Sequence, residues 1–174
     1  MDNQDTKKHL LQITALATGY CSLLEHAREF EKEDFIKEIL GYLPRLYYAF
    51  SEFVPEDPDS VSLDFGFYRT YVDEDFYESV RRNVEVLLGP DDAFLETFEE
   101  DMKYSDTPIG ASIAECLADI FQPLYNFISI VKESDGEQAA GAYAECRENF
   151  EAYWAQTLCN VMRALNHLRF GSSV

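Results

Sequence analysis

The chain has 174 residues, of which 47% are hydrophobic and 14% are aromatic, and it carries a formal net charge of −19. A chain of this length can hold a hydrophobic core without disulfides or metals, and its apolar content excludes a disordered protein. The charge argues against binding to nucleic acid or to anionic membranes, because both would be repelled. We therefore expect one globular domain, residues 1–174, that binds neither.

Two amphipathic helices are expected in the first 53 residues. Apolar side chains recur every three or four positions from about Asp5 to Arg28, and again from about Lys32 to Phe53. Gly41 and Pro44 interrupt the second pattern. It therefore predicts either one kinked helix or two short helices with Pro44 in the first turn of the second.

An irregular acidic segment is expected next, around residues 54–72, where prolines alternate with carboxylates. Helix is expected to resume near Asp73, whose carboxylate can cap the first turn, and to stop at Gly89. Pro90 and the two aspartates after it then predict a short helix that ends near Phe98.

The most apolar segment runs from about Ile109 to Lys132, after a Thr107-Pro108 pair that is typical of a helix start. Apolar side chains surround almost all of this segment, so it is expected to be a central helix. A capping-box sequence at 134–137 predicts a last helix that continues to about Phe170. No convincing strand separates these helices, so the predicted fold is an all-α, single-domain bundle of about six helices.

One line of polar side chains follows the central segment at alternating spacings of three and four residues: Ser112, Glu115, Asp119, Gln122, Asn126, Ser129 and Glu133. Such a line is ordinarily the solvent-exposed edge of an amphipathic helix. Pro123 favours a second interpretation, because it has no N–H for the carbonyl of Asp119. A free carbonyl beside a carboxylate would suit a cation, a donor-rich ligand or a basic side chain.

The last predicted helix carries a second polar line that includes Gln156 and Asn160. If the two helices are neighbours, Arg163 can pair with Asp119 or Glu115. The sequence thus predicts one candidate interaction or ligand site, made of Glu115, Asp119, Gln122, Asn126, Asn160, Arg163 and His167.

The four cysteines fall inside apolar helical patterns, and no CxxC pair or zinc spacing occurs. We expect Cys21, Cys116, Cys146 and Cys159 to be small core residues in a reducing compartment. The polar N-terminus and the lack of a run of about 20 apolar residues predict a cytoplasmic protein without a membrane span. No nucleotide-binding, nucleophile or complete metal-ligand motif occurs, so we expect no catalytic residue, no metal and no cofactor.

Two sequence motifs resemble those of a known family. The sequences LGPDDAF at 88–94 and LADIFQPL at 117–124 resemble a family of uncharacterised bacterial all-helical proteins, a domain of unknown function with an L-G-x-D-D turn and an L-A-D-I-[FY]-Q helix. The Tyr-Trp pair at 153–154 and the sequence LNHLR at 165–169 extend the resemblance over most of the chain. It implies an all-helical intracellular protein, and it implies no activity, cofactor or substrate. Members of the family often have an acidic residue in place of Pro123.

The acidic residues are concentrated in the middle of the chain, where residues 52–101 contain 16 Asp or Glu and 3 Lys or Arg. Acidity of this kind often serves solubility alone. As a function, we expect a non-catalytic protein-binding or adaptor module whose acidic surface, beside aromatic residues such as Phe65, Phe67, Tyr68 and Tyr71, binds a basic protein in a salt-sensitive way. The alternative is a small-molecule- or metal-binding helical enzyme with a site near Asp119. The aromatic density also allows a homodimer interface.

Overall fold

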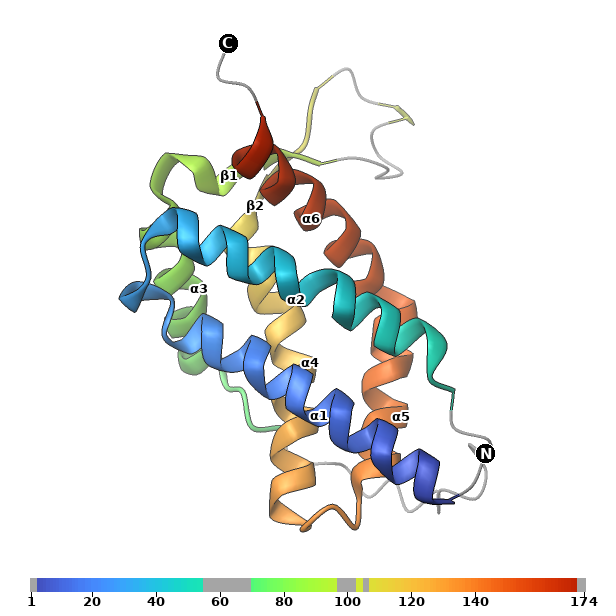
Figure 1. Ribbon diagram of the computed structural model, residues 1–174. Helices are drawn as coiled ribbons and strands as arrows, with labels where there is room; N and C mark the ends of the chain where they lie inside the picture. The colour runs from blue at the N-terminus through green and yellow to red at the C-terminus, as the bar shows by residue number, and fades with distance from the viewer. Residues whose placement is uncertain (1–2, 55–69, 97–102, 105–106, 172–174) are drawn as a thin grey trace.

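The structure, a computed structural model, describes residues 3–54, 70–96, 103–104 and 107–171. Helices dominate this part of the chain: α1 (Asn3–Glu25), α2 (Lys32–Glu52), α3 (Glu74–Leu88), α4 (Ile113–Glu133), α5 (Ala139–Asn149) and α6 (Ala155–Phe170). Two three-residue strands, β1 (Ala93–Leu95) and β2 (Gly110–Ser112), pair in antiparallel fashion (Figure 1). The predicted all-α bundle is confirmed. None of the described helices is both long enough and apolar enough to cross a membrane.

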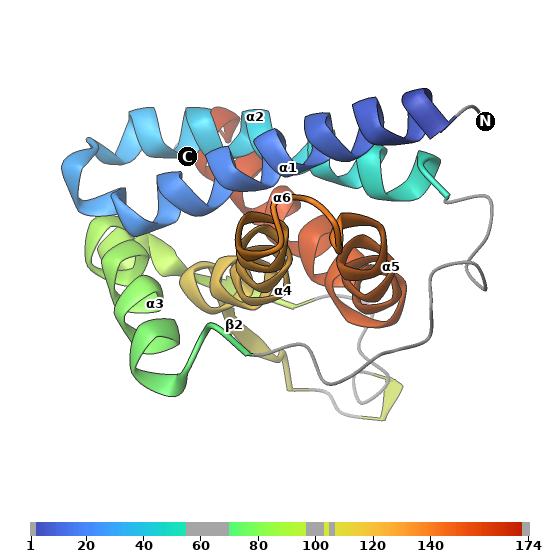
Figure 2. The same ribbon diagram turned by 90° about the horizontal axis from the view of Figure 1, so that it is seen from below.

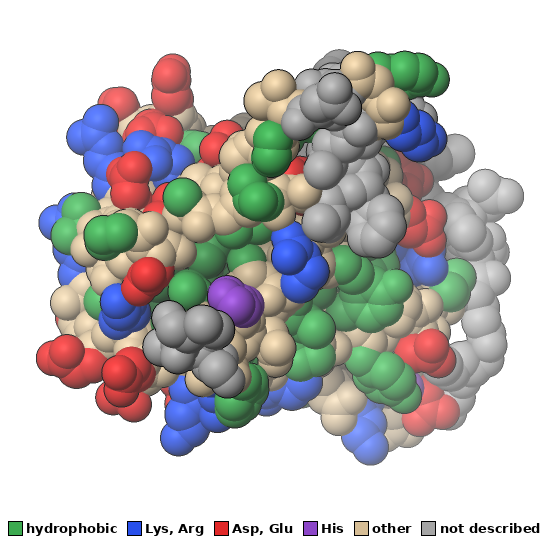
Figure 3. All heavy atoms as spheres, turned by 90° about the horizontal axis from the view of Figure 1, so that it is seen from above, with side chains coloured by type: hydrophobic (Ala, Val, Ile, Leu, Met, Phe, Trp, Pro, Cys, Tyr) green, Lys and Arg blue, Asp and Glu red, His purple; other side chains and the backbone are tan. Residues whose placement is uncertain are grey.

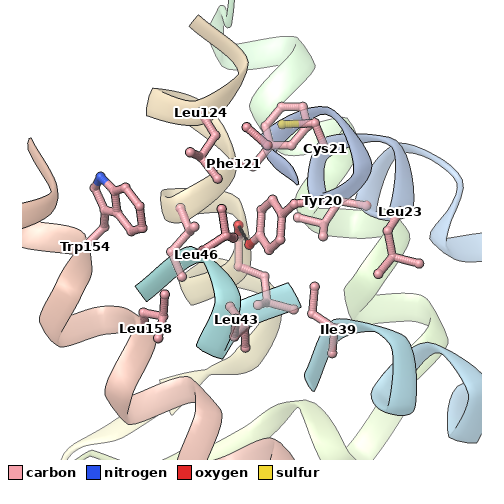
Figure 4. Packing of buried hydrophobic residues seen from close by; sticks show 14 of the residues in the cluster. Tyr20, Cys21, Leu23, Ile39, Leu43, Leu46, Phe121, Leu124, Trp154 and Leu158 are labelled. Atoms are coloured by element: carbon pink, nitrogen blue, oxygen red, sulfur yellow. Dashed lines mark hydrogen bonds between the residues drawn. The ribbon is translucent and has the colours of Figure 1, made fainter. Parts of the chain in front are cut away.

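The α4 helix lies at the centre of the bundle, as its apolar sequence predicts. Seen from below, it has α1 and α2 above it, α3 on the left and α5 on the right (Figure 2). Leu117, Phe121 and Leu124 are completely buried on its inner faces. From α1, the buried Tyr20 hydroxyl donates a 2.8 Å hydrogen bond to the Leu117 carbonyl (Figure 4). This bond satisfies two polar groups inside the core, which would otherwise be costly to bury.

The α2 helix runs through Pro44 without a break, so the interpretation as two short helices is wrong. Its C-terminal carbonyls are satisfied by side chains from α5 instead of by a glycine cap. The Tyr143 hydroxyl donates to the Phe53 carbonyl at 2.8 Å, and Arg147 Nε donates to the Phe50 carbonyl at 3.2 Å. These contacts join α2 and α5, which are 90 or more residues apart in the sequence.

The prediction of a helix from Pro90 to Phe98 is wrong. A single 3-10 turn, Gly89–Asp92, leads into β1, and residues 97 and 98 lie outside the described part of the chain. The long-range pairing of β1 with β2 outweighs the local helix signal. The acidic segment expected around 54–72 is described only at residues 54 and 70–72, which are not helical.

Two predicted helix starts are also wrong. Helix α4 begins at Ile113 with Ser112 as its N-cap, because the residues after the Thr107-Pro108 pair form β2. Ser134, expected to open the last helix, instead ends α4: its backbone N–H bonds to the Ile130 carbonyl. A tight turn with positive φ at Asp135 and Gly136 then leads into α5. The last helix therefore begins at Ala139 and is helical at every residue to Phe170, its predicted end, with a π-helical turn, Phe150–Trp154, between α5 and α6.

Three of the four cysteines are buried as predicted, but Cys159 is exposed. Burial raises the pKa of Cys21 and Cys146 well above the usual range and raises the pKa of Cys116 to about 12. We therefore expect one fast-reacting thiol in the native protein at pH 8 and four after denaturation, because only the accessible thiolate reacts. A thiol count with Ellman's reagent, with and without guanidinium, measures this. Two or more fast native thiols would contradict the packing around α4.

Candidate functional site

A polar cleft of about 910 Å³ opens between α4 on one side and the π-helical turn and α6 on the other. All three residues of β2 also line it. Five of the seven predicted site residues line this cleft: Glu115, Asp119, Gln122, Asn126 and Asn160. The polar line on α4 is therefore one wall of a concave site over most of its length, and not only a solvent-exposed edge.

Two carboxylates stand on the α4 wall, one helical turn apart. Glu115 and Asp119 are both exposed to solvent. The Tyr77 hydroxyl of α3 donates a 2.7 Å hydrogen bond to Asp119 Oδ1. Burial raises the pKa of Tyr77, and the hydrogen bond and negative charge of Asp119 raise it further, so Tyr77 stays neutral. A neutral Tyr77 is a fixed donor that orients the Asp119 carboxylate.

Both walls of the cleft contain an irregular helical turn. On α4, Pro123 leaves the Asp119 carbonyl without its usual helical donor, while the Pro123 carbonyl accepts a 3.6 Å bond from Cys146 Sγ. On the opposite wall, the π-helical turn presents Tyr153, which is 72% exposed. Single π-helical turns occur frequently at functional sites. The sequence shows Pro123 directly, whereas no pattern in it indicates the π-helical turn.

The cleft also contains a hydrogen-bonded polar pair, Asn160 and Glu96, of which the sequence analysis predicted only Asn160. The Asn160 side chain is only 6% exposed, and its Nδ2 donates to Glu96 Oε1. Glu96 follows β1, and its backbone N–H donates to the Ile109 carbonyl at 2.8 Å. The strand pairing therefore carries a carboxylate to a helix that is 64 residues away. Glu96 is one of many acidic residues in this part of the sequence, and no sequence pattern distinguishes it from the others.

Three of the predicted site residues make contacts, or occupy positions, that the sequence analysis did not predict: Asn126, Arg163 and His167. Asn126 Oδ1 accepts a 2.9 Å bond from the Tyr71 backbone N–H, which holds the non-helical residues 70–72 against α4. Arg163 Nη2 donates to the Leu95 carbonyl of β1 at 2.6 Å, and this replaces the predicted pairing with Asp119 or Glu115. His167 is exposed near the end of α6. Neither Arg163 nor His167 belongs to the lining of the cleft.

The cleft is negatively charged. Its described lining contains the carboxylates Glu96, Glu115 and Asp119 but no Lys, Arg or His. By contrast, the molecular face seen from above shows acidic and basic side chains together, with hydrophobic ones between them (Figure 3). Within the described ranges, no group of three or more His, Cys, Asp or Glu residues is arranged to hold a metal ion. The lining thus suits a positively charged, hydrogen-bond-donating group.

Comparison with known proteins identifies the family. A family model described as "Domain of unknown function (DUF5063)" matches residues 4–171. The chain belongs to this family. The DUF5063 assignment confirms the resemblance to a family of unknown function. A crystal structure of protein BF1032 from Bacteroides fragilis is similar, with 29% sequence identity, a TM-score of 0.82 and 96% of each chain covered. No curated protein matches the sequence.

Three residues of the L-G-x-D-D sequence of this DUF5063 chain, Gly89, Asp91 and Asp92, have structural roles. Gly89 has a φ of +57°, in the left-handed region that favours glycine. Asp91 Oδ2 lies 2.6 Å from Lys32 Nζ, which ties the turn to α2. Asp92 accepts 2.7 Å bonds from the Ala114 backbone N–H and the Ser112 hydroxyl, at the N-terminus of α4. The motif therefore positions the helix that carries two of the three carboxylates of the cleft, Glu115 and Asp119.

Proposed function

We propose that the protein is a non-catalytic binding module whose acidic cleft takes up the positively charged side chains of a basic protein partner. The observation that carries the proposal is the composition of the cleft: three carboxylates and several carboxamides line one concavity, and its described lining has no basic side chain. Four free cysteines suit a reducing compartment, so we propose that the protein is cytoplasmic.

The arrangement of the lining suits Lys or Arg side chains. Glu115 and Asp119 are four residues apart on one helix, so their side chains are neighbours. Two adjacent carboxylates can accept several charge-assisted hydrogen bonds from one guanidinium or from two ammonium groups. The walls of a cleft also focus its electric field, which raises the local concentration of a cationic partner. The exposed ring of Tyr153 offers a further favourable contact for a cation.

The chemistry of the cleft favours binding over catalysis. Its one described thiol, Cys116, has a pKa of about 12 because of burial and, next, the negative charge of Glu96. Such a thiol is protonated at neutral pH and is a poor nucleophile. The raised pKa of Tyr77 likewise keeps its hydroxyl bound to Asp119 as a donor. These groups suit a rigid, negatively charged surface that holds a cation.

Charge-dependent binding tests the proposal. The probes are spermine and an alternating Lys-Thr hexapeptide with blocked ends, titrated by calorimetry at about 20 mM and about 500 mM salt. We expect Glu115→Gln with Asp119→Asn to weaken binding of both probes about tenfold at low salt, because each of the two lost charge pairs contributes about 0.7 kcal/mol. High salt should weaken binding to the wild type in the same direction.

The matched control is Glu137→Gln with Glu148→Gln, which changes the net charge equally at two exposed positions outside the lining of the cleft. This variant should bind both probes as the wild type does. If the two double variants weaken binding equally, the probes respond only to the total charge of −19, and the cleft is not the binding site.

A further inference from the structure

Strand β2 pairs with β1 along one edge, and its residues Gly110, Ala111 and Ser112 line the acidic cleft. Glu96 donates its backbone N–H to the directly opposite Ile109, so the alternation of an antiparallel pair leaves Gly110 as a non-hydrogen-bonded position. The N–H and C=O of Gly110 therefore point away from β1. Leu95, which lies opposite Gly110, shows the same alternation, since its carbonyl points away from β2 and accepts a bond from Arg163. Arg163 of α6 thus occupies the outer edge of β1.

Nothing comparable occupies the outer edge of β2 in the part of the chain that the structure describes. There, β1 is the only strand paired with β2. Gly110, Ala111 and Ser112 all line the cleft, and Gly110 can do so only with backbone atoms. A Cβ placed on Gly110 would meet no atom within 4 Å, so the space beside it is open. A strand edge of this kind is a ready template for a further strand.

We propose that an extended, lysine- or arginine-bearing peptide segment of the partner adds to β2 as a third strand, with Gly110 exchanging two main-chain hydrogen bonds with it. This inference rests on the proposed function and specifies how the partner is bound. Peptide addition to a sheet edge takes affinity from main-chain bonds and specificity from alternate side chains. Charge complementarity selects the occupant, because Glu96, Glu115 and Asp119 line the same cleft.

The direct connection of β2 to α4 places the main-chain hydrogen bonds at Gly110 close to the carboxylates of α4. Helix α4 begins directly after β2, and the Ser112 hydroxyl that ends the strand accepts a 3.1 Å bond from the Glu115 backbone N–H. A peptide held at Gly110 therefore passes beside the first turns of α4. Its side chains on one face, two residues apart, can reach the carboxylates of that helix.

Gly110→Pro tests the inference with Gly110→Ala as its control. Proline removes the outward N–H and fills the space beside it, yet Gly110 gives no ladder bond to β1 that could be lost. Alanine keeps the N–H and enters open space. We expect Gly110→Pro to bind the Lys-Thr hexapeptide about tenfold more weakly than the wild type does, and Gly110→Ala to bind it equally well. Melting temperatures of both variants verify that they are folded.

Spermine separates the two proposals, because it carries charge but has no peptide backbone. If added-strand binding is correct, Gly110→Pro leaves spermine binding unchanged, and a hexapeptide N-methylated at alternate residues binds the wild type about tenfold more weakly. Equal hexapeptide binding by Gly110→Pro and wild type would overturn the added strand while the acidic cleft stands. The added strand is also overturned if the hexapeptide does not bind to the wild type but spermine does. Failure of both probes overturns both proposals.

Discussion

Replacing Phe50 with alanine is expected to lower the free energy of unfolding by about 4 kcal/mol. Phe50 is completely buried at the C-terminal end of α2, where helices α2 and α5 and the π-helical turn meet. Its ring centroid lies 4.8 Å from that of Trp154, 5.2 Å from that of Tyr143 and 5.7 Å from that of Phe150. The substitution removes these contacts and leaves a cavity that rigid neighbours fill only partly. Urea unfolding followed by circular dichroism measures the loss.

Tyr48→Ala is the control for this prediction. Tyr48 lies two residues away on α2, but its side chain is 69% exposed, so the change should stay within about 0.5 kcal/mol. Since Phe50 packs against the π-helical turn, Phe50→Ala should also weaken binding in the cleft. A Phe50→Ala variant as stable as Tyr48→Ala would show that the aromatic cluster does not hold the turn in place.

Replacing Asp92 with alanine should cost about 2 kcal/mol of stability, the second largest effect that we expect. Asp92 accepts hydrogen bonds from the Ala114 backbone N–H and from the Ser112 hydroxyl. Its negative charge also lies at the N-terminus of α4, where it interacts favourably with the helix dipole. Without it, a donor at the start of the central helix loses its partner. Thermal and urea unfolding measure the effect.

The neighbouring aspartate of the motif provides the comparison. Asp91 forms one ion pair with Lys32, and both side chains are more than 40% exposed. Asp91→Ala should therefore cost at most about 1 kcal/mol. An equal effect of the two substitutions would mean that the motif stabilises the fold through its charge and not through the hydrogen bonds of Asp92.

The sequence predicts the helices well wherever local signals decide them. The apolar periodicity places α1, α2 and α3, and Asp73 caps α3 by accepting the Phe76 backbone N–H at 2.8 Å, as predicted. The central place of α4 follows from its apolar residues. The sequence analysis misses features that depend on distant contacts: strands of three residues are too short for an alternating pattern. The π-helical turn also has no local signature.

The site is predictable only in part, for geometric reasons. The polar line on α4 is local, so four of the predicted residues on that helix line the same cleft. The polar line on α6 extends from Gln156 to His167. Because an α-helix rises about 1.5 Å per residue, its later members lie farther along the helix than the cleft lining. Asn160 therefore lies in the cleft, whereas Arg163 and His167 lie farther along α6. Glu96 and Tyr77 reach the site through tertiary structure alone.

The most direct test of the acidic cleft is an NMR titration of the 15N-labelled protein with the Lys-Thr hexapeptide. The cleft predicts that the largest amide shift changes fall on residues 110–126 and 149–160, and that Glu115→Gln with Asp119→Asn removes them. The apolar groove between α1 and α2, lined by His9, Leu16, Tyr48 and others, is the comparison region. Shift changes centred there, or spread evenly over the surface, would contradict a binding site in the cleft.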